Sequence, residues 1–248
     1  ELNESTIFPI DSEHSAIHQC LSGKKDTSGG VKKIILTGSG GPFLNRNLKE
    51  FIHITPEEAV MHPVWKMGKK ISVDSATMMN KGLEVIEAKW LFKIDSEKIG
   101  ILVHPEGIVH SLVEFEDASL LAQMSVPDMK IPIAYGLGFP ERIKSNSQRL
   151  SLEKIEQLNF CKPDLKKFPS IGMSRASLDS GGTSPSLLNA ANEEAVRAFL
   201  DKKIYFTQII EIISFVMDTI PIKAVKELEN IFQADTLARK SALTRIQQ

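Results

Sequence analysis

Short apolar runs alternate with helical patterns in the first half of the chain. Apolar runs of strand length occupy residues 7–10, 31–36 and 70–73, and the first and last of them lead into helical patterns at 16–21 and 77–92. Strands that alternate with helices are typical of an α/β arrangement. We therefore predict a strand at each run and a helix after the first and the third.

A different pattern follows residue 101. Apolar and polar residues alternate from 108 to 116, the turn-like Asp117-Ala118-Ser119 comes next, and residues 120–124 are again apolar. This order predicts an antiparallel hairpin. Combined with the strands of the first half, it predicts a mixed sheet.

The last part of the chain has a helical pattern. Residues 139–182 hold Pro140, Pro163 and Pro169 with weak periodicity, which is typical of a long connection. Ser184-Pro185 suits a helix start, and amphipathic stretches follow at 186–200, 207–219 and 222–246. We predict an α/β (α+β) catalytic domain with a mixed sheet over residues 1–138, a linker over 139–182 and a C-terminal helical bundle over 183–248.

Composition excludes several classes of partner. With 30 basic and 31 acidic residues the formal charge is -1, so no overall field recruits nucleic acid or an anionic membrane. The most apolar stretch, 209–220, is interrupted by Glu211 and Asp218 and is too short to span a bilayer. Cys20 and Cys161 lack the spacing of a zinc site or a disulfide framework, which fits a reducing compartment. Affinity for an anion must therefore come from a local site.

The first candidate site is Asp11-Ser12-Glu13, at the end of the predicted strand 7–10. In an extended segment, residues two apart project to the same side, so both carboxylates can face one point. The alternative is that Asp11 or Ser12 only caps the following helix.

The second candidate is the run from Ser72 to Glu84. It is predicted as a strand that runs into a helix, and the helix has an apolar face and a polar face that carries Thr77, Asn80, Lys81 and Glu84. The alternative is a solvated surface with a Lys81–Glu84 pair. Hydroxyl, amide and ammonium donors near a helix N-terminus, from Ser75, Asn80 and Lys81, favour a phosphate site instead. The apolar face predicts a core set of four: Met79, Leu83, Ile86 and Trp90.

The two candidates together suggest a metal site. If Glu84 meets Asp11 and Glu13, three carboxylates converge, and their repulsion is costly unless a cation neutralises it. Mg²⁺ or Mn²⁺ prefers oxygen ligands and keeps positions open for water or substrate oxygens.

Three further features carry candidate chemistry. The glycine-rich stretch 36–43 brings backbone N–H groups and the Ser39 hydroxyl toward an anion, or it is only a turn; it lacks the spacing of the P-loop and of the dinucleotide motif. Residues 62–68 form a loop with His62, Trp65 and Met67, which suits a lid over a substrate or a Trp65 fixed in the core. His110, within the predicted hairpin, is a candidate or a buried, satisfied histidine.

The order and the residues of these segments resemble the 1-deoxy-D-xylulose-5-phosphate reductoisomerase family over nearly the whole chain. The stretches that carry the resemblance are residues 9–17, 36–43, 62–68, 72–87, 104–113 and 181–191. The resemblance implies that Asp11, Glu13 and Glu84 bind Mg²⁺, Mn²⁺ or Co²⁺. It implies that Ser39, Ser75, Asn80 and Lys81 hold the phosphate or nearby hydroxyls of a sugar phosphate, with Ser12 near the reacting carbons. His62, Trp65 and Met67 would lie on a closing lid and His110 near the metal; Glu13, His62, Lys81 and His110 would act in catalysis.

The resemblance also implies what lies outside this sequence. The chain starts at Glu1 with few residues before the first apolar run, so we expect it to begin inside a larger protein, after the family's NADPH-binding domain. NADPH is then a cofactor of the longer enzyme, and this chain alone should not transfer hydride. A homodimer is expected, in the cytoplasm of a bacterium or in a plastid.

Two other functions remain open from the sequence. A metal-dependent sugar-phosphate aldolase or isomerase needs no nicotinamide, and the absence of a dinucleotide motif favours it. A non-catalytic binding or assembly module would use the acidic and glycine-rich segments only as caps and turns.

Overall fold

The computed structural model describes residues 6–21 and 30–248. The chain divides into two compact units, Glu1–Ser39 with Glu87–Pro163 (unit 1) and Gly40–Ile86 with Asp164–Gln248 (unit 2). These units follow contacts and not chain order, so they differ from the ranges 1–138, 139–182 and 183–248 expected from the sequence. Those ranges stay a prediction. Each unit is described by itself below.

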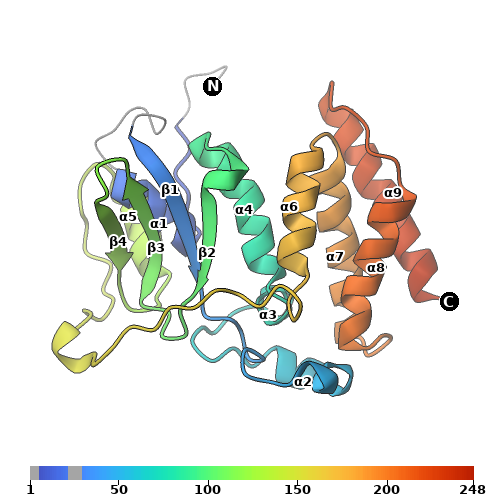
Figure 1. Ribbon diagram of the computed structural model, residues 1–248, viewed down its shortest axis with the longest axis horizontal. Helices are drawn as coiled ribbons and strands as arrows, with labels where there is room; N and C mark the ends of the chain where they lie inside the picture. Colours follow the sequence, from blue (N-terminus) through green and yellow to red (C-terminus); the bar gives the residue numbers. More distant parts are fainter. Residues whose placement is uncertain (1–5, 22–29) are drawn as a thin grey trace. The chain divides into compact units, whose positions relative to one another are not determined.

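The described part of unit 1 contains a mixed sheet of four strands in the order β2-β1-β3-β4 (Figure 1). The strands are β1 (Val31–Gly38), β2 (Ile99–Val103), β3 (Val109–Phe115) and β4 (Leu120–Met124). β1 is parallel to β2, with Leu36 opposite Ile101, and antiparallel to β3. β3 and β4 form the predicted antiparallel hairpin. The predicted mixed sheet is therefore confirmed.

Helix α1 (Ser12–Leu21) packs on β1, β3 and β4, and contacts α5 (Lys130–Gly138) (Figure 1). It buries Ala16, Ile17 and Leu21 against the sheet. The described residues before it form no strand, so the prediction of a strand at 7–10 is wrong. Pro9 offers no backbone N–H to a sheet, and Phe8 instead packs its ring against His18, with the ring centroids 5.6 Å apart.

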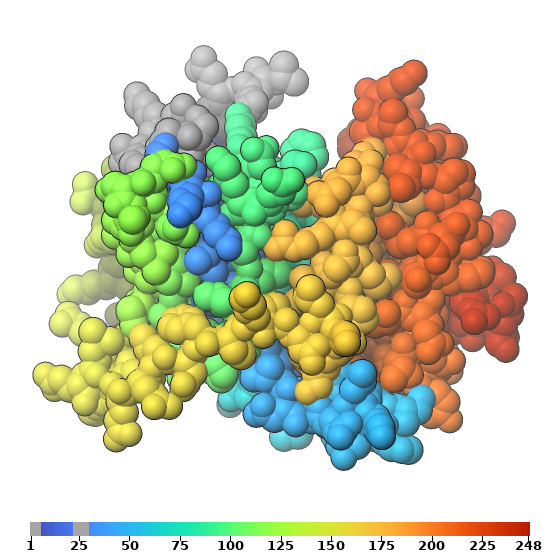
Figure 2. All heavy atoms as spheres, in the orientation of Figure 1, coloured from blue at the N-terminus to red at the C-terminus, as the bar shows by residue number. Residues whose placement is uncertain are grey.

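The connection after α5 runs largely along the surface, where its residues 140–163 are yellow in Figure 2. One point of it joins the sheet: Cys161 forms an antiparallel bridge with Val103 at the end of β2. The backbone N–H of each residue donates to the carbonyl of the other, at 2.8 and 3.0 Å. The bridge therefore covers the outer edge of β2 at this point.

Unit 2 ends in the predicted helical bundle, formed by α7 (Ser184–Leu200), α8 (Phe206–Thr219) and α9 (Leu228–Ile246) (Figure 1). α7 is the central helix, since it packs on both α8 and α9 and buries residues on several sides. Helix α6 (Ser170–Ser180) precedes it and lies within the stretch expected to be a linker. Its small polar residues gave no helical periodicity, but packing buries Ser170, Ser174 and Ser177.

The remaining helices of unit 2 are short, except for α4. Thr55 and Glu58 form a capping box at the start of α2 (Pro56–Ala59), and a 3-10 helix occupies Leu48–His53. Residues 70–73 lie in helix α3 (Lys69–Ala76), so the predicted strand there is wrong. The Ser72 hydroxyl donates to the Gly68 carbonyl at 3.0 Å, one helical turn earlier. A run of four residues is too short to reveal such a helical contact.

Helix α4 (Met79–Phe92) begins in unit 2 and continues into unit 1. Its apolar face was predicted only in part. Met79 and Ile86 are buried, but Trp90 is 71% exposed, and Val85 and Ala88 are buried instead. Among the described residues, no helix is both long and apolar enough to cross a membrane.

Two helical glycines give a matched test of the packing in unit 2. A Cβ at Gly82 of α4 would lie 2.2 Å from the Ser174 Oγ and 3.2 Å from the Ser170 carbonyl oxygen, whereas a Cβ at Gly172 of α6 would meet nothing within 4 Å. We expect Gly172→Ala to raise the free energy of unfolding by ~0.5 kcal/mol, because alanine lowers the conformational entropy of the unfolded chain. We expect Gly82→Ala to lower it by about 1–3 kcal/mol because α6 must move. Urea unfolding measures both, and equal effects would contradict the close packing of α4 on α6.

Candidate functional site

The acidic tripeptide lies at the N-terminus of α1, in unit 1. The Asp11 carboxylate accepts a hydrogen bond from the Glu13 backbone N–H at 3.2 Å, as a helix cap does, and the Ser12 hydroxyl donates to the Glu13 carboxylate. Carboxylate oxygens of Asp11 and Glu13 lie within 4.8 Å of one another. The cap and the acidic pair are thus compatible. A helical first turn brings the two groups together, not the extended segment that the sequence suggested.

His14 extends this group and was not among the candidates from the sequence. Its side chain is buried, and its Nδ1 lies 3.5 Å from the Glu87 Oε2 and 3.9 Å from the Asp11 Oδ1. Asp11 and His14 are three residues apart, the spacing at which side chains meet on a helix. That spacing is a signal in the sequence, but it applies only once the helix is known to begin at Ser12.

Ser39 and His110 are the other two candidates in unit 1. Ser39 directly follows β1 and is half-buried. His110 is buried in β3, where its Nε2 lies 2.8 Å from the Ser125 hydroxyl and 3.2 Å from the Ser125 carbonyl oxygen. Ser125 thus satisfies one ring nitrogen, which agrees with the alternative reading of a buried, hydrogen-bonded histidine.

The second group of candidates lies where α3 meets α4, in unit 2. Ser75 is in the last turn of α3, Met78 takes a positive φ of 60°, and α4 begins at Met79. This abrupt change of direction places Asn80 and Lys81 in the first turn of α4. The stretch 72–84 therefore consists of two helices joined by a short turn, not of a strand that runs into a helix.

Asn80 and Lys81 converge on Glu84. The Asn80 Nδ2 donates to the Glu84 Oε1 at 2.5 Å, and the Lys81 Nζ forms an ion pair with the same oxygen at 2.7 Å. Glu84 is 2% exposed and Lys81 is 5% exposed, so the expectation of a solvated surface pair is wrong. A buried carboxylate needs such donors because its desolvation is costly.

The glycine-rich loop approaches the same segment. Gly40 and Gly41 have positive φ values of 84° and 67°, and a Cβ at Gly41 would lie 2.6 Å from the Ser75 carbonyl oxygen. Both the conformation and the lack of space require glycine at position 41. The loop thus packs its backbone directly against the end of α3.

His62 closes a turn in its own loop. The Nδ1 of its ring accepts hydrogen bonds from the backbone N–H groups of Val64, at 3.1 Å, and Trp65, at 2.9 Å. An accepting Nδ1 places the ring proton on Nε2 in the neutral form. Trp65 and Met67 are half-buried, so the expectation of a Trp65 fixed in the core is not supported.

The loop can be tested through this histidine. Replacing His62 with Ala removes the acceptor of two backbone N–H groups, whereas Asn can still close the turn with its side-chain oxygen. We expect His62→Ala to speed tryptic cleavage after Lys66 by about 5- to 30-fold, because the open loop becomes more populated. His62→Asn should be cut nearly as slowly as the original chain. Equal cleavage of all three proteins would show that the ring does not hold the turn.

Comparisons with known proteins agree on one family. The 1-deoxy-D-xylulose 5-phosphate reductoisomerase C-terminal domain family matches residues 7–92, and the DXP reductoisomerase C-terminal domain family matches residues 124–241. The 1-deoxy-D-xylulose 5-phosphate reductoisomerase of Paraburkholderia xenovorans is 50% identical over 240 residues, which are 97% of this chain and 60% of the relative. That of Nitrosomonas eutropha is 52% identical over 241 residues, 96% of this chain and 58% of the relative.

Solved structures give the same result. A DOX-P reductoisomerase in complex with NADPH, fosmidomycin and magnesium matches with a TM-score of 0.93 and 45% identity, over 98% of this chain and 64% of the other. The Zymomonas mobilis enzyme in complex with NADPH matches with a TM-score of 0.90 and 44% identity, over 98% and 62%. The chain spans about 60% of the length of the curated relatives it matches.

Proposed function

The chain belongs to the 1-deoxy-D-xylulose 5-phosphate reductoisomerase family, and on that basis we propose that it supplies the metal and substrate sites of such an enzyme. The reaction rearranges the carbon skeleton of 1-deoxy-D-xylulose 5-phosphate and reduces the product to 2-C-methyl-D-erythritol 4-phosphate, a precursor of isoprenoids. The observation that carries the proposal is the buried Glu84 with Asn80 and Lys81 at the start of α4. These three residues belong to the stretch 72–87, one of those that carry the resemblance to the family.

Asp11, Glu13 and Glu84 are the proposed metal ligands. They are a group of acidic side chains of the number and type that hold a divalent ion. Carboxylate oxygens are the ligands that Mg²⁺ and Mn²⁺ prefer, so the donor set fits such an ion, and Co²⁺ is compatible with it. Magnesium is named with a similar structure. When bound, the ion would polarise the oxygens of the substrate.

The substrate phosphate is the proposed ligand of the donors around the α3–α4 turn. Ser75, Asn80 and Lys81 supply a hydroxyl, an amide and an ammonium group near the first turn of α4, where backbone N–H groups also favour an anion. Ser39 adds a hydroxyl after β1. Ser12, beside Glu13, is the proposed neighbour of the reacting carbons.

The remaining residues would complete and enclose the site. We propose that the loop with His62, Trp65 and Met67 closes over the substrate and excludes water, since its apolar side chains are only half-buried. His62, with its proton on Nε2, offers a donor to a substrate oxygen. Glu13, Lys81 and His110 would hold charges and protons near the reacting atoms.

Reduction requires a hydride, which we assign to NADPH, the cofactor named with two similar structures. The reduction consumes one hydride and one proton for each molecule of product. The residues discussed above bind and orient the sugar phosphate, whereas NADPH supplies the electrons.

A homodimer is also proposed. Within the described residues β4 pairs only with β3, and it exposes 52% of Leu120 and 48% of Leu121. A strand edge with exposed apolar side chains is suited to a partner. A second copy of the chain is the partner that the family membership favours.

The metal site can be tested by calorimetry. We expect Glu84→Gln to weaken Mn²⁺ binding by about 100-fold or more. Loss of a residue that only hydrogen-bonds to a metal ligand already costs about 10- to 100-fold in affinity, and loss of a ligand itself should cost at least as much. Glu229→Gln, an acidic residue of α9 in the same unit, is the control and should leave the affinity unchanged. If the Glu84 variant binds Mn²⁺ as tightly as the original chain, the proposed ligand set is wrong.

The need for hydride separates this proposal from a metal-dependent aldolase or isomerase. The chain is mixed with Mn²⁺ and 1-deoxy-D-xylulose 5-phosphate, without NADPH, and the phosphorus compounds are followed by NMR. We expect binding of the substrate but no 2-C-methyl-D-erythritol 4-phosphate, because no electron source is present. Steady conversion to another sugar phosphate would favour the aldolase or isomerase.

A further inference from the structure

We propose that Asn192 of α7 is a positioning residue that fixes the α3–α4 turn through a hydrogen bond to Asp74. The turn carries Ser75, Asn80 and Lys81, so the inference rests on the proposed function of these residues in binding the substrate phosphate. Asn192 itself is far along the chain from the motif, and neither it nor Asp74 belongs to the proposed ligand sets.

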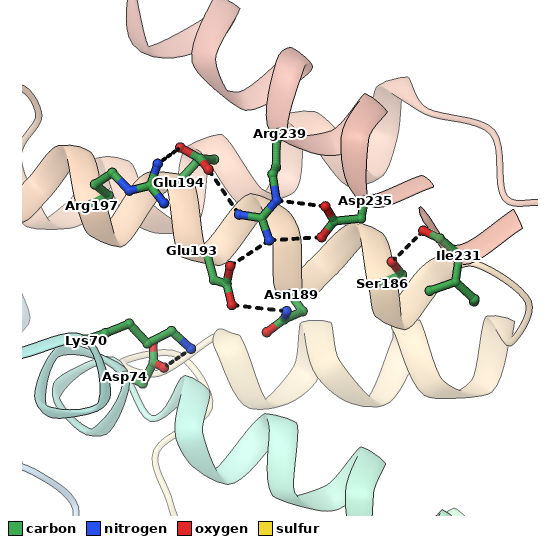
Figure 3. A network of polar contacts seen from close by, with 10 residues as sticks. All are labelled: Lys70, Asp74, Ser186, Asn189, Glu193, Glu194, Arg197, Ile231, Asp235 and Arg239. Atoms are coloured by element: carbon green, nitrogen blue, oxygen red, sulfur yellow. Dashed lines mark hydrogen bonds and ion pairs between the residues drawn. The ribbon is translucent and has the colours of Figure 1, made fainter. Parts of the chain in front are cut away.

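The contact joins two fully buried side chains of unit 2. Asp74 is 2% exposed and Asn192 is 0% exposed. The Asn192 Nδ2 donates to the Asp74 Oδ1 at 2.8 Å, and the Lys70 Nζ pairs with the Asp74 Oδ2 at 2.6 Å (the Lys70–Asp74 pair is drawn in Figure 3). Each carboxylate oxygen thus has its own donor, which fixes the carboxylate in one orientation.

The position of Asp74 explains why this orientation matters. Asp74 directly precedes Ser75 in the last turn of α3, and the chain reverses at Met78 before α4 begins. A helix end has few backbone hydrogen bonds of its own and frays easily. A side-chain anchor at Asp74 therefore restrains the residues that follow it, Ser75 first.

Burial makes this anchor costly. Burial raises the pKa of the Asp74 carboxyl, while Lys70 and Asn192 act in the opposite direction. In the described part of the chain, the Asn192 Oδ1 is buried without a hydrogen-bond partner. An unsatisfied buried acceptor costs free energy that an apolar residue of similar size would avoid. Among the described residues, the side-chain amide of Asn192 therefore makes one hydrogen bond, from its Nδ2 to Asp74.

A polar network next to Asn192 in sequence links α7 to α9 (Figure 3). The Arg239 guanidinium pairs with Glu193 at 2.6 Å, with Glu194 at 3.0 Å and with Asp235 of its own helix at 2.8 Å. Glu193 and Glu194 are the next two residues after Asn192. Arg239 therefore ties the segment of α7 that carries Asn192 to α9, and this link opposes rotation of α7 about its axis.

Two other contacts hold the turn and should let variants at Asn192 fold. The Ser170 hydroxyl donates to the Thr77 carbonyl at 2.5 Å, and Ser174 packs against Gly82. The first contact holds the backbone at Thr77, the C-cap of α3, and the second holds the first turns of α4, whereas the Asn192–Asp74 contact anchors a side chain within the last turn of α3. Loss of the amide should therefore affect ligand binding more than folding.

The test measures the affinity of the full 248-residue chain for 1-deoxy-D-xylulose 5-phosphate at saturating Mn²⁺, by calorimetry well below the unfolding temperature. Asn192→Leu removes the donor and keeps the size of the side chain. We expect about tenfold weaker binding, because Ser75 is no longer held in place. Asn189→Ala, one turn earlier on α7, is the matched control: Asn189 contacts Glu193 and not Asp74, so the affinity should stay within about twofold.

A rescue separates positioning from general stability. Asn192→Asp places two carboxylates against each other and should weaken binding. The double variant Asn192→Asp with Asp74→Asn exchanges the two groups, restores a donor and an acceptor, and should recover affinity to within about threefold of the original chain. This comparison also decides the question if the Leu variant does not fold.

Each failure has a distinct meaning. If the original chain binds the sugar phosphate and Asn192→Leu binds it equally well, the positioning role is wrong. If the exchanged pair binds no better than Asn192→Asp, it is also wrong. If the original chain with Mn²⁺ does not bind the sugar phosphate at all, the proposed function fails, and this inference fails with it.

Discussion

The burial of a carboxylate, Glu84, is the constraint on which the rest of unit 2 depends. A charge at 2% exposure is tolerated only with nearby donors, and Asn80 and Lys81 supply them from the same helix. Both donors can reach Glu84 because α4 has begun by Met79, directly after the positive φ of Met78. The close packing of Gly41 on Ser75 then adapts the preceding loop to the turn.

The sequence predicted those parts of the fold whose pattern is local. Strand β1, the hairpin of β3 and β4, and helix α8 follow from runs and alternation that need no knowledge of the rest of the chain. Helix α6 was missed because its serines become a packing surface only in the folded chain, where they lie against α4 and α7. Residues 70–73 were assigned to a strand because four residues do not distinguish the two periods.

The candidate site shows the same division. Asp11, Glu13, Asn80, Lys81 and Glu84 were identified from residue type and spacing, and the structure places the last three in one polar cluster. His14 was missed because its nearness to Asp11 depends on where α1 begins. Asn192 gave no signal at all, since its relation to Asp74 spans 118 positions of the chain. Such pairs arise from tertiary packing and leave no local pattern.

The bridge between Val103 and Cys161 has a consequence for how the sheet meets other molecules. It occupies the backbone groups of Val103 at the end of the β2 border, while the described residues place no strand beyond β4 at the other border. A sheet that is open on both sides can add copies without limit, as fibres do. A sheet that pairs at one border only forms a closed twofold pair, because the two joined edges exhaust the available backbone groups. At Val103 the surface segment takes up backbone groups that would otherwise be open to pairing with another chain.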